Sequence, residues 1–206
     1  MIVQLTPVGP GATLTVTATP VETCAGTSLI VAATFASVPV NLYDVSFSIG
    51  GSYFTGSGRS VLAVIDPSSG SISGAGTITN PRTGQSASFN LSAQYSRTRT
   101  RGAFLYVEHT ADGDLKVQAE AFDALALVGN EAIFWAKNVS VRSASGNEIR
   151  TGFSLRLRAV DNGESGRLDA LGIQLRAPDG RVVWDWSQDP ATLQSGNISI
   201  LKRGSR

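Results

Sequence analysis

The amino-acid sequence predicts an all-β protein, a β-sandwich of antiparallel sheets with jelly-roll or immunoglobulin-like character. Apolar and polar residues alternate with a period of two along the chain, which is typical of strands with one buried face. Glycine, asparagine and aspartate gather between these runs, where tight turns need them. Pro20, Pro39 and Pro67 also fall between runs and interrupt no ladder of hydrogen bonds, so we expect almost no helix.

The first part of the chain predicts four strands. They cover residues 12–18, 28–35, 42–49 and 59–65. In the first of them leucine and valine share one face and threonines occupy the other, because side chains alternate along a strand. The charge pattern then changes abruptly, since Glu22 and Asp44 are the only charged residues before Arg59. This change indicates a boundary between two structural units near residues 58–66.

The second part of the chain continues the same pattern. Strands are expected at residues 86–95, 102–109, 115–123, 131–143, 148–160, 170–177, 182–186 and 196–202. Residues 119–129 are rich in alanine and leucine and resemble a helix in composition, but the turn signals around them favour a strand. Short strands at this spacing are typical of a sandwich.

Composition narrows the class of protein. The net charge is +1, which gives no strong field toward nucleic acid, and no apolar run is long enough to span a bilayer. The N-terminus lacks the pattern of a secretory signal, which favours a cytoplasmic or phage protein; a mature secreted protein is the alternative. Cys24 is the only cysteine, and we expect it to pack as a small hydrophobic residue.

The sequence offers little for catalysis. His109 is the only histidine, and no Gly-x-Ser-x-Gly elbow is present. Gly74 and Gly76 lack the third glycine and the following helix of a dinucleotide-binding loop. Paired carboxylates leave glycosidase chemistry open, but dispersed acids on a β-surface mostly belong to solvated faces. We predict that the protein is not an enzyme.

A polar turn at residues 161–169 is the candidate metal site. Asp161, Asn162, Glu164 and Asp169 carry the hard oxygen ligands that Ca²⁺ prefers. The turn lacks the alternating acidic pattern of an EF-hand loop. The alternative is a solvated hairpin loop that needs no cofactor.

Three arginines form a candidate anion site. Arg97, Arg99 and Arg101 would share one face of an extended chain, which suits contact with an anion or a polysaccharide. The alternative is a solvated hairpin tip, or a charged edge that prevents pairing with another sheet.

Two tryptophans form a candidate sugar site. Trp184 and Trp186 share one face of the expected strand at residues 182–186, and paired rings of this kind can stack on sugars. The alternative places one ring over the core and leaves the other half exposed.

The stretch at residues 64–78 carries the clearest family signal. It reads Val-Ile-Asp-Pro-Ser-Ser-Gly-Ser-Ile-Ser-Gly-Ala-Gly-Thr-Ile, a strand end followed by a glycine-rich strand whose glycines permit close backbone packing. Together with residues 87–95, 179–185 and 195–200, this stretch resembles the post-COAP module found at the C-terminus of secreted bacterial proteins. Ala75 stands where that family has a glycine, and Leu201 where it has a histidine.

The resemblance covers about residues 60–202 and implies how the chain is organised. It implies a β-sandwich at residues 64–202, preceded by a small immunoglobulin-like or PKD-like β unit at residues 1–63 and followed by a tail at residues 203–206. It also implies a non-catalytic bacterial module, extracellular or on the cell surface, that serves as a structural part or mediates attachment or assembly. Its partner would be a cell-surface polysaccharide, a protein or a second copy of the chain.

Two alternative functions stay open at the level of sequence. One is a carbohydrate-binding module that uses Trp184 and Trp186. The other is a phage or virion structural protein, which the start at methionine and the threonine-rich strands favour. Neither nucleic acid nor a membrane span is expected in any of these cases.

Overall fold

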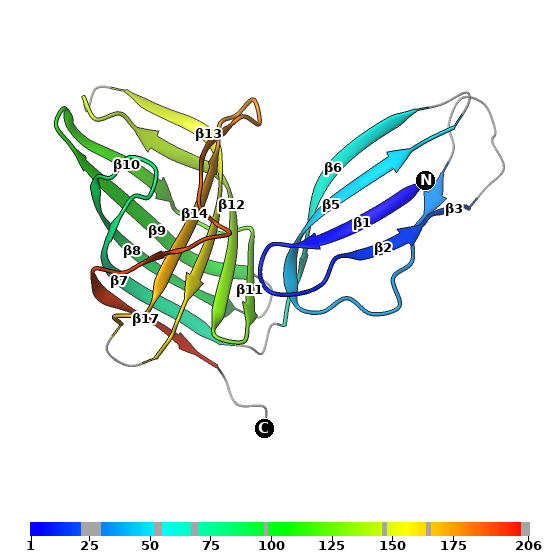
Figure 1. Cartoon of the computed structure of the whole chain (residues 1–206), viewed down its shortest axis with the longest axis horizontal. Helices are drawn as coiled ribbons and strands as arrows, with labels where there is room; N and C mark the ends of the chain where they lie inside the picture. The colour runs from blue at the N-terminus through cyan, green and yellow to red at the C-terminus, as the bar shows by residue number, and fades with distance from the viewer. Residues whose placement is uncertain are drawn as a thin grey trace.

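The computed structural model describes residues 1–21, 30–51, 55–66, 70–96, 99–145, 148–163 and 166–202. Its strands pair antiparallel throughout, and the described residues form no helix (Figure 1). The predicted all-β fold of antiparallel sheets is confirmed. In this part of the chain there is accordingly no helix long and apolar enough to cross a membrane. Cys24 lies outside the described residues.

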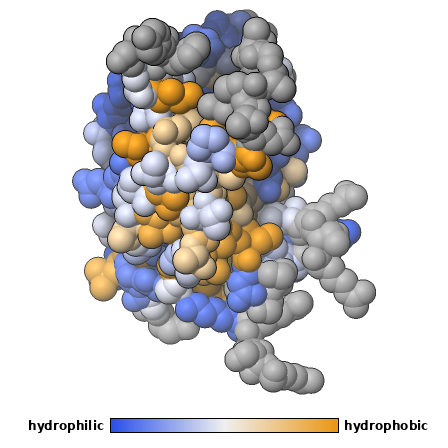
Figure 2. All heavy atoms as spheres, turned by 90° about the vertical axis from the view of Figure 1, so that its right-hand side faces the viewer, coloured by the Kyte–Doolittle hydropathy of each residue, from blue (hydrophilic) through white to orange (hydrophobic). Residues whose placement is uncertain are grey.

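A four-stranded sheet is built from the first part of the chain. Its strands are β1 (Ile2–Pro7), β2 (Leu14–Thr17), β5 (Asn41–Ile49) and β6 (Gly56–Val64), in the spatial order β2-β1-β5-β6. Two short strands, β3 (Thr19–Pro20) and β4 (Val31–Ala32), pair with each other beside it. Seen from the side of this sheet, apolar residues lie scattered among polar ones (Figure 2). Such scattered exposure is ordinary for a folded surface.

A larger, curled sheet of eleven strands contains every strand after residue 70. These strands are β7 (Ser71–Thr79), β8 (Ser86–Ser96), β9 (Arg99–Thr110), β10 (Gly113–Ala119), β11 (Ala124–Val128), β12 (Glu131–Arg142), β13 (Ile149–Val160), β14 (Ala170–Arg176), β15 (Val182–Asp185), β16 (Ala191–Thr192) and β17 (Ser195–Leu201). The main path runs β15-β14-β13-β12-β10-β9-β8-β7-β17, while β11 pairs with β12 and β16 with β14. The alanine-rich segment at residues 119–129 is therefore extended and not helical, as its flanking turns predicted, but residues 120–123 separate the end of β10 from β11.

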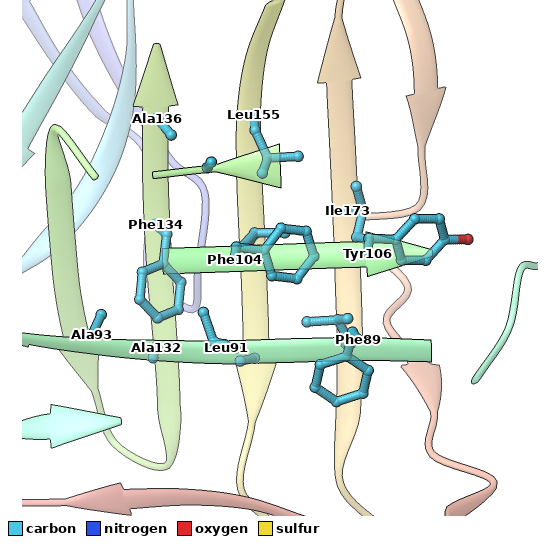
Figure 3. Packing of buried hydrophobic residues seen from close by; sticks show 14 of the residues in the cluster. Phe89, Leu91, Ala93, Phe104, Tyr106, Ala132, Phe134, Ala136, Leu155 and Ile173 are labelled. Atoms are coloured by element: carbon cyan, nitrogen blue, oxygen red, sulfur yellow. The ribbon is translucent and has the colours of Figure 1, made fainter. Parts of the chain in front are cut away.

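The main core lies inside the curl of the large sheet. Strands β8 and β9 cross over β12, β13 and β14, so that the two halves of the sheet pack face to face as two layers (Figure 3). Phe104 of β9 lies by Phe134 and Leu155 of the opposite layer, while Tyr106 of β9 lies beside Ile173 (Figure 3). All five side chains are at most 1% exposed. Burial of these large apolar side chains is the main force that holds the sheet curled.

The last strand joins the large sheet through β7, and glycines make this pairing possible. A side chain on Gly76 would overlap the carbonyl oxygen of Ser195, and one on Gly196 would overlap that of Ala75. Gly196 also has a φ of 100°, which residues with a side chain rarely adopt. The glycine-rich stretch singled out in the sequence therefore lets the first and last strands of this sheet approach closely.

The two sheets meet through a small apolar cluster. Leu42 and Val8 from the first sheet and its flanking segment pack against Ile133 of β12 and Ala124 of β11. Arg158 and Glu131 form an ion pair at the edge of this contact, with Nε–Oε2 and Nη2–Oε1 distances of 2.7 and 2.8 Å. Figure 1 shows the sheets close together at β11 and diverging along β5 and β6.

Candidate functional site

A row of four side chains crosses the outer face of the large sheet. Trp135, Arg156, Gln174 and Asp185 lie directly opposite one another on β12, β13, β14 and β15. Residues opposite one another in antiparallel strands point to the same face of the sheet. Their neighbours along the strands, such as Leu155, belong to the buried core. The row therefore faces away from the core and toward the four-stranded sheet.

A cleft of about 410 Å³ lies between three members of this row, Trp135, Arg156 and Gln174, and the four-stranded sheet. The large sheet contributes Trp135, Arg156, Gln174 and Arg176, while β5 and β6 contribute Asp44 and Arg59. Along β5 the side chain of Leu42 packs in the apolar cluster, and Asp44, on the same face, lines the cleft. The cleft thus opens directly beside the apolar contact, at the point where the two sheets diverge.

An ion pair spans the cleft from one sheet to the other. Arg156 donates from Nη1 to Oδ2 of Asp44 at 2.7 Å and from Nη2 to Oδ1, although the two residues are 112 positions apart in the chain. The Arg156 side chain is 10% exposed, whereas that of Asp44 is 51% exposed. The guanidinium is therefore held within the wall of the cleft, and the carboxylate reaches it from the more open side.

A second set of hydrogen bonds orients the neighbouring side chains. Gln174 donates to Oδ2 of Asp185 at 2.7 Å and accepts from Nε of Arg176 at 2.9 Å. Partial burial by itself raises the pKa of Asp185. The hydrogen bonds from Gln174 and Ser187, together with the charge of Arg176, outweigh it and lower the pKa below its usual value. Both ends of the Gln174 amide are thus in use, which keeps Arg176 at the cleft wall.

The cleft carries more positive than negative charge. Arg59, Arg156 and Arg176 line it, against the single carboxylate of Asp44. The side chain of Arg59 is exposed and makes no hydrogen bond or ion pair with the described residues. Trp135 is partly exposed at one end of the row, and Nζ of Lys137 lies 4.4 Å from its ring centroid. This combination of arginine forks and an aromatic ring suits an anionic ligand that has a flat or ring-shaped body.

The predicted calcium ligands lie elsewhere and hold the last strand. Asp161 accepts from the main-chain amides of Gly163 and Ile200, one on each carboxylate oxygen. Asp169, which is fully buried, likewise accepts from the amides of Asn162 and Ile198. Glu164 lies outside the described residues, and no group of three potential metal-binding side chains occurs among those that are described. The two aspartates act here as acceptors for the backbone.

The amide of Asn162 is also engaged with protein atoms. Its Nδ2 donates to the carbonyl oxygen of Leu168 at 2.6 Å, and its Oδ1 accepts from Asn130 at 2.9 Å. On the described part of this loop, Asp161, Asn162 and Asp169 are therefore all hydrogen-bonded to protein atoms. Calcium binding stays a prediction.

Of the three predicted arginines, Arg101 is not among the residues that line the cleft. Arg97 lies outside the described residues. Arg99 and Arg101 belong to β9, next to its hairpin with β8, and Arg101 is exposed there. The arginines that line the cleft come from β6, β13 and β14 instead.

The two predicted tryptophans are buried. Trp184 and Trp186 are 8% and 7% exposed and belong to the main core. Their ring centroids are 5.9 Å apart, and Trp184 also meets Tyr106 edge-on at 5.6 Å. A sugar-stacking platform needs ring faces open to solvent, and these rings do not provide one. The sequence correctly indicated that they share a face, but that face is the inner one, and Asp185 between them points outward to the row.

Sequence reasoning missed the cleft itself. The segment Leu155-Arg156-Leu157-Arg158 alternates leucine with arginine, which signals a strand with a strongly cationic outer face. That pattern was available in the sequence. Asp44, the partner of Arg156, could not be identified from the sequence, because only the packing of the two sheets brings β5 next to β13.

A scan against protein-family models and searches of curated proteins and of solved structures return no match to this chain. The resemblance of residues 60–202 to the post-COAP module stays a prediction.

Proposed function

We propose that this protein is a non-catalytic attachment module whose cleft binds an acidic polysaccharide. The observation that carries the proposal is the cluster of Arg59, Arg156 and Arg176 around the cleft between the sheets. Arginine forks recognise carboxylates through paired hydrogen bonds, which gives both energy and orientation. The partly exposed ring of Trp135 supplies an apolar surface beside them on which a sugar ring can lie.

The sequence resemblance supports the cellular setting of this proposal. A module that resembles the C-terminal part of secreted bacterial proteins belongs outside the cell or on its surface, where acidic polysaccharides are abundant partners. The cleft replaces Trp184 and Trp186 as the proposed carbohydrate site, because those rings are buried. The proposal thus keeps the predicted partner class and moves it to residues that line the cleft.

Isothermal titration calorimetry with polygalacturonate tests the proposal, with dextran as the neutral polymer. We expect binding to polygalacturonate that weakens as salt is added, and no binding to dextran. Arg59→Ala should lower the affinity roughly tenfold, because it removes charge-assisted hydrogen bonds to the ligand. Arg142→Ala, which removes an exposed arginine outside the cleft, is the matched control and should bind as the wild type does. Equal binding to polygalacturonate and dextran would refute the proposal. An equal loss of affinity in Arg59→Ala and Arg142→Ala would refute it as well.

A further inference from the structure

The Asp44–Arg156 ion pair has an unequal burial that bears on how the cleft binds its ligand. We infer that Asp44 occupies the position of a ligand carboxylate and that the ligand displaces it from Arg156. This inference rests on the proposed function, since it describes how the same cleft engages an acidic chain. It names the recognised group as a planar carboxylate and identifies Arg156 as its principal partner.

Asp44, and not Arg156, is the partner that can leave the ion pair. Arg156 lies in the middle of β13, between β12 and β14, and its side chain is 10% exposed. The Asp44 side chain is 51% exposed, so much of its solvation is retained in the pair and it returns to water at small cost. The guanidinium therefore stays in place when the pair opens, and the carboxylate is the part that moves.

Arg156 needs another anion in place of Asp44 when the ion pair opens. A guanidinium buried in a protein wall is strongly destabilising when it has no anionic partner. The pair consequently opens only when another anion is available to Arg156. The cleft gives such an anion access, because both members of the pair line its wall beside about 410 Å³ of open space.

The geometry of the Arg156 contact selects the shape of the group that replaces Asp44. Arg156 holds both oxygens of Asp44 through two nitrogens, a geometry that matches a planar carboxylate. Along the same row Trp135 and Gln174 lie directly opposite Arg156 on the two neighbouring strands. A uronic acid fits this arrangement, since its carboxylate meets Arg156 while its ring lies toward Trp135. An acidic peptide has no sugar ring to place there.

If Asp44 and the ligand compete for Arg156, removal of the Asp44 carboxylate should strengthen ligand binding. Asp44→Asn should bind polygalacturonate roughly tenfold more tightly than the wild type, because Arg156 no longer has to be released from an internal carboxylate. Asp189→Asn is the control: Asp189 is an exposed acid that forms no hydrogen bond or ion pair within the described part of the chain, and its replacement changes the net charge equally. That variant should match the wild type.

The outcomes separate this inference from the proposed function. Unchanged or weaker binding by Asp44→Asn, with a wild type that binds, overturns the exchange and leaves the attachment function standing. Equal tightening by Asp189→Asn also overturns it, because the gain would then reflect net charge alone. Tight binding of polyglutamate by Asp44→Asn without binding of polygalacturonate overturns the assignment of a uronic acid. A wild type that binds no acidic polymer refutes both proposals.

A measurement on the wild-type protein covers the case in which Asp44→Asn does not fold. The side-chain Nε–H resonance of Arg156, identified by its absence in Arg156→Lys, reports the partner of the guanidinium. Titration with galacturonate should shift this resonance, while glucose should leave it unchanged. A resonance that stays in place at saturating polygalacturonate overturns the exchange.

Discussion

The carboxylate of Asp169 accepts a hydrogen bond from the main-chain amide of Ile198 at 2.7 Å, across 29 residues of chain. Asp161 makes the same kind of contact with Ile200 at 2.8 Å. In an antiparallel strand successive amides point alternately to the two sides, and one side of β17 is already paired with β7. The two carboxylates therefore satisfy amides that β7 does not, and they hold the last strand at its otherwise unpaired edge.

The role of Asp169 predicts a large effect of a nearly isosteric change. Asp169→Asn should lower the free energy of unfolding by about 2–3 kcal/mol, because an amide group cannot accept from both Asn162 and Ile198. Chemical denaturation measures this loss. Asp112→Asn, in the exposed turn between β9 and β10, is the control and should unfold as the wild type does. Equal unfolding free energies for the two variants would show that the contacts to β17 contribute little.

The glycines between β7 and β17 predict a second effect on stability. Gly76→Ala should destabilise the protein by about 1–3 kcal/mol, since the new methyl group would overlap the carbonyl oxygen of Ser195. At Gly56 an added methyl group meets no atom within 4 Å, and Gly56→Ala should be neutral or slightly stabilising. Thermal unfolding compares the two variants directly. A Gly76→Ala protein as stable as Gly56→Ala would contradict the close approach of the two strands.

The lowered pKa of Asp185 predicts how stability changes in acid. A carboxyl group whose pKa is lower in the folded than in the unfolded state adds stability above its unfolded pKa. That stability is lost as the pH falls through the folded value. We expect wild-type stability to fall as the pH drops below the ordinary aspartate pKa of 3.8, and Asp185→Asn to show a smaller fall.

Urea denaturation across this pH range measures the effect. Gln174→Ala removes a hydrogen bond to Asp185 and should also reduce the fall in the free energy of unfolding as the pH drops. If neither substitution changes how the free energy of unfolding depends on pH, the charged form of Asp185 is not stabilised in the folded protein.

The burial of the tryptophans predicts which one solvent can reach. Trp135 is partly exposed, whereas Trp184 and Trp186 lie in the core. Acrylamide should therefore quench mainly the emission of Trp135, and Trp135→Phe should lose most of the quenchable fluorescence. Trp184→Phe serves as the comparison and should keep that fraction. Loss of quenching in Trp184→Phe instead would place its ring at the surface.

The all-β fold and most strand positions could be predicted from local patterns. The alternation along residues 148–160 corresponds closely to β13, and that along residues 86–95 to β8. These predictions succeed because alternation and turn residues act over a few positions. The tryptophans show the limit of such reasoning: their spacing indicates a shared face, but spacing cannot say whether that face is turned inward or outward.

By itself, the sequence determined which segments become strands, which side chains share a face, and where glycines allow close pairing. Only the tertiary structure decided that Asp44 meets Arg156, that Asp161 and Asp169 hold the last strand, and that Trp184 and Trp186 lie inside the curl. The physical reason is the range of the interactions. Strand formation is set by near neighbours, whereas a cleft between two sheets depends on how far each sheet curls and where their apolar surfaces meet, which involves residues more than a hundred positions apart.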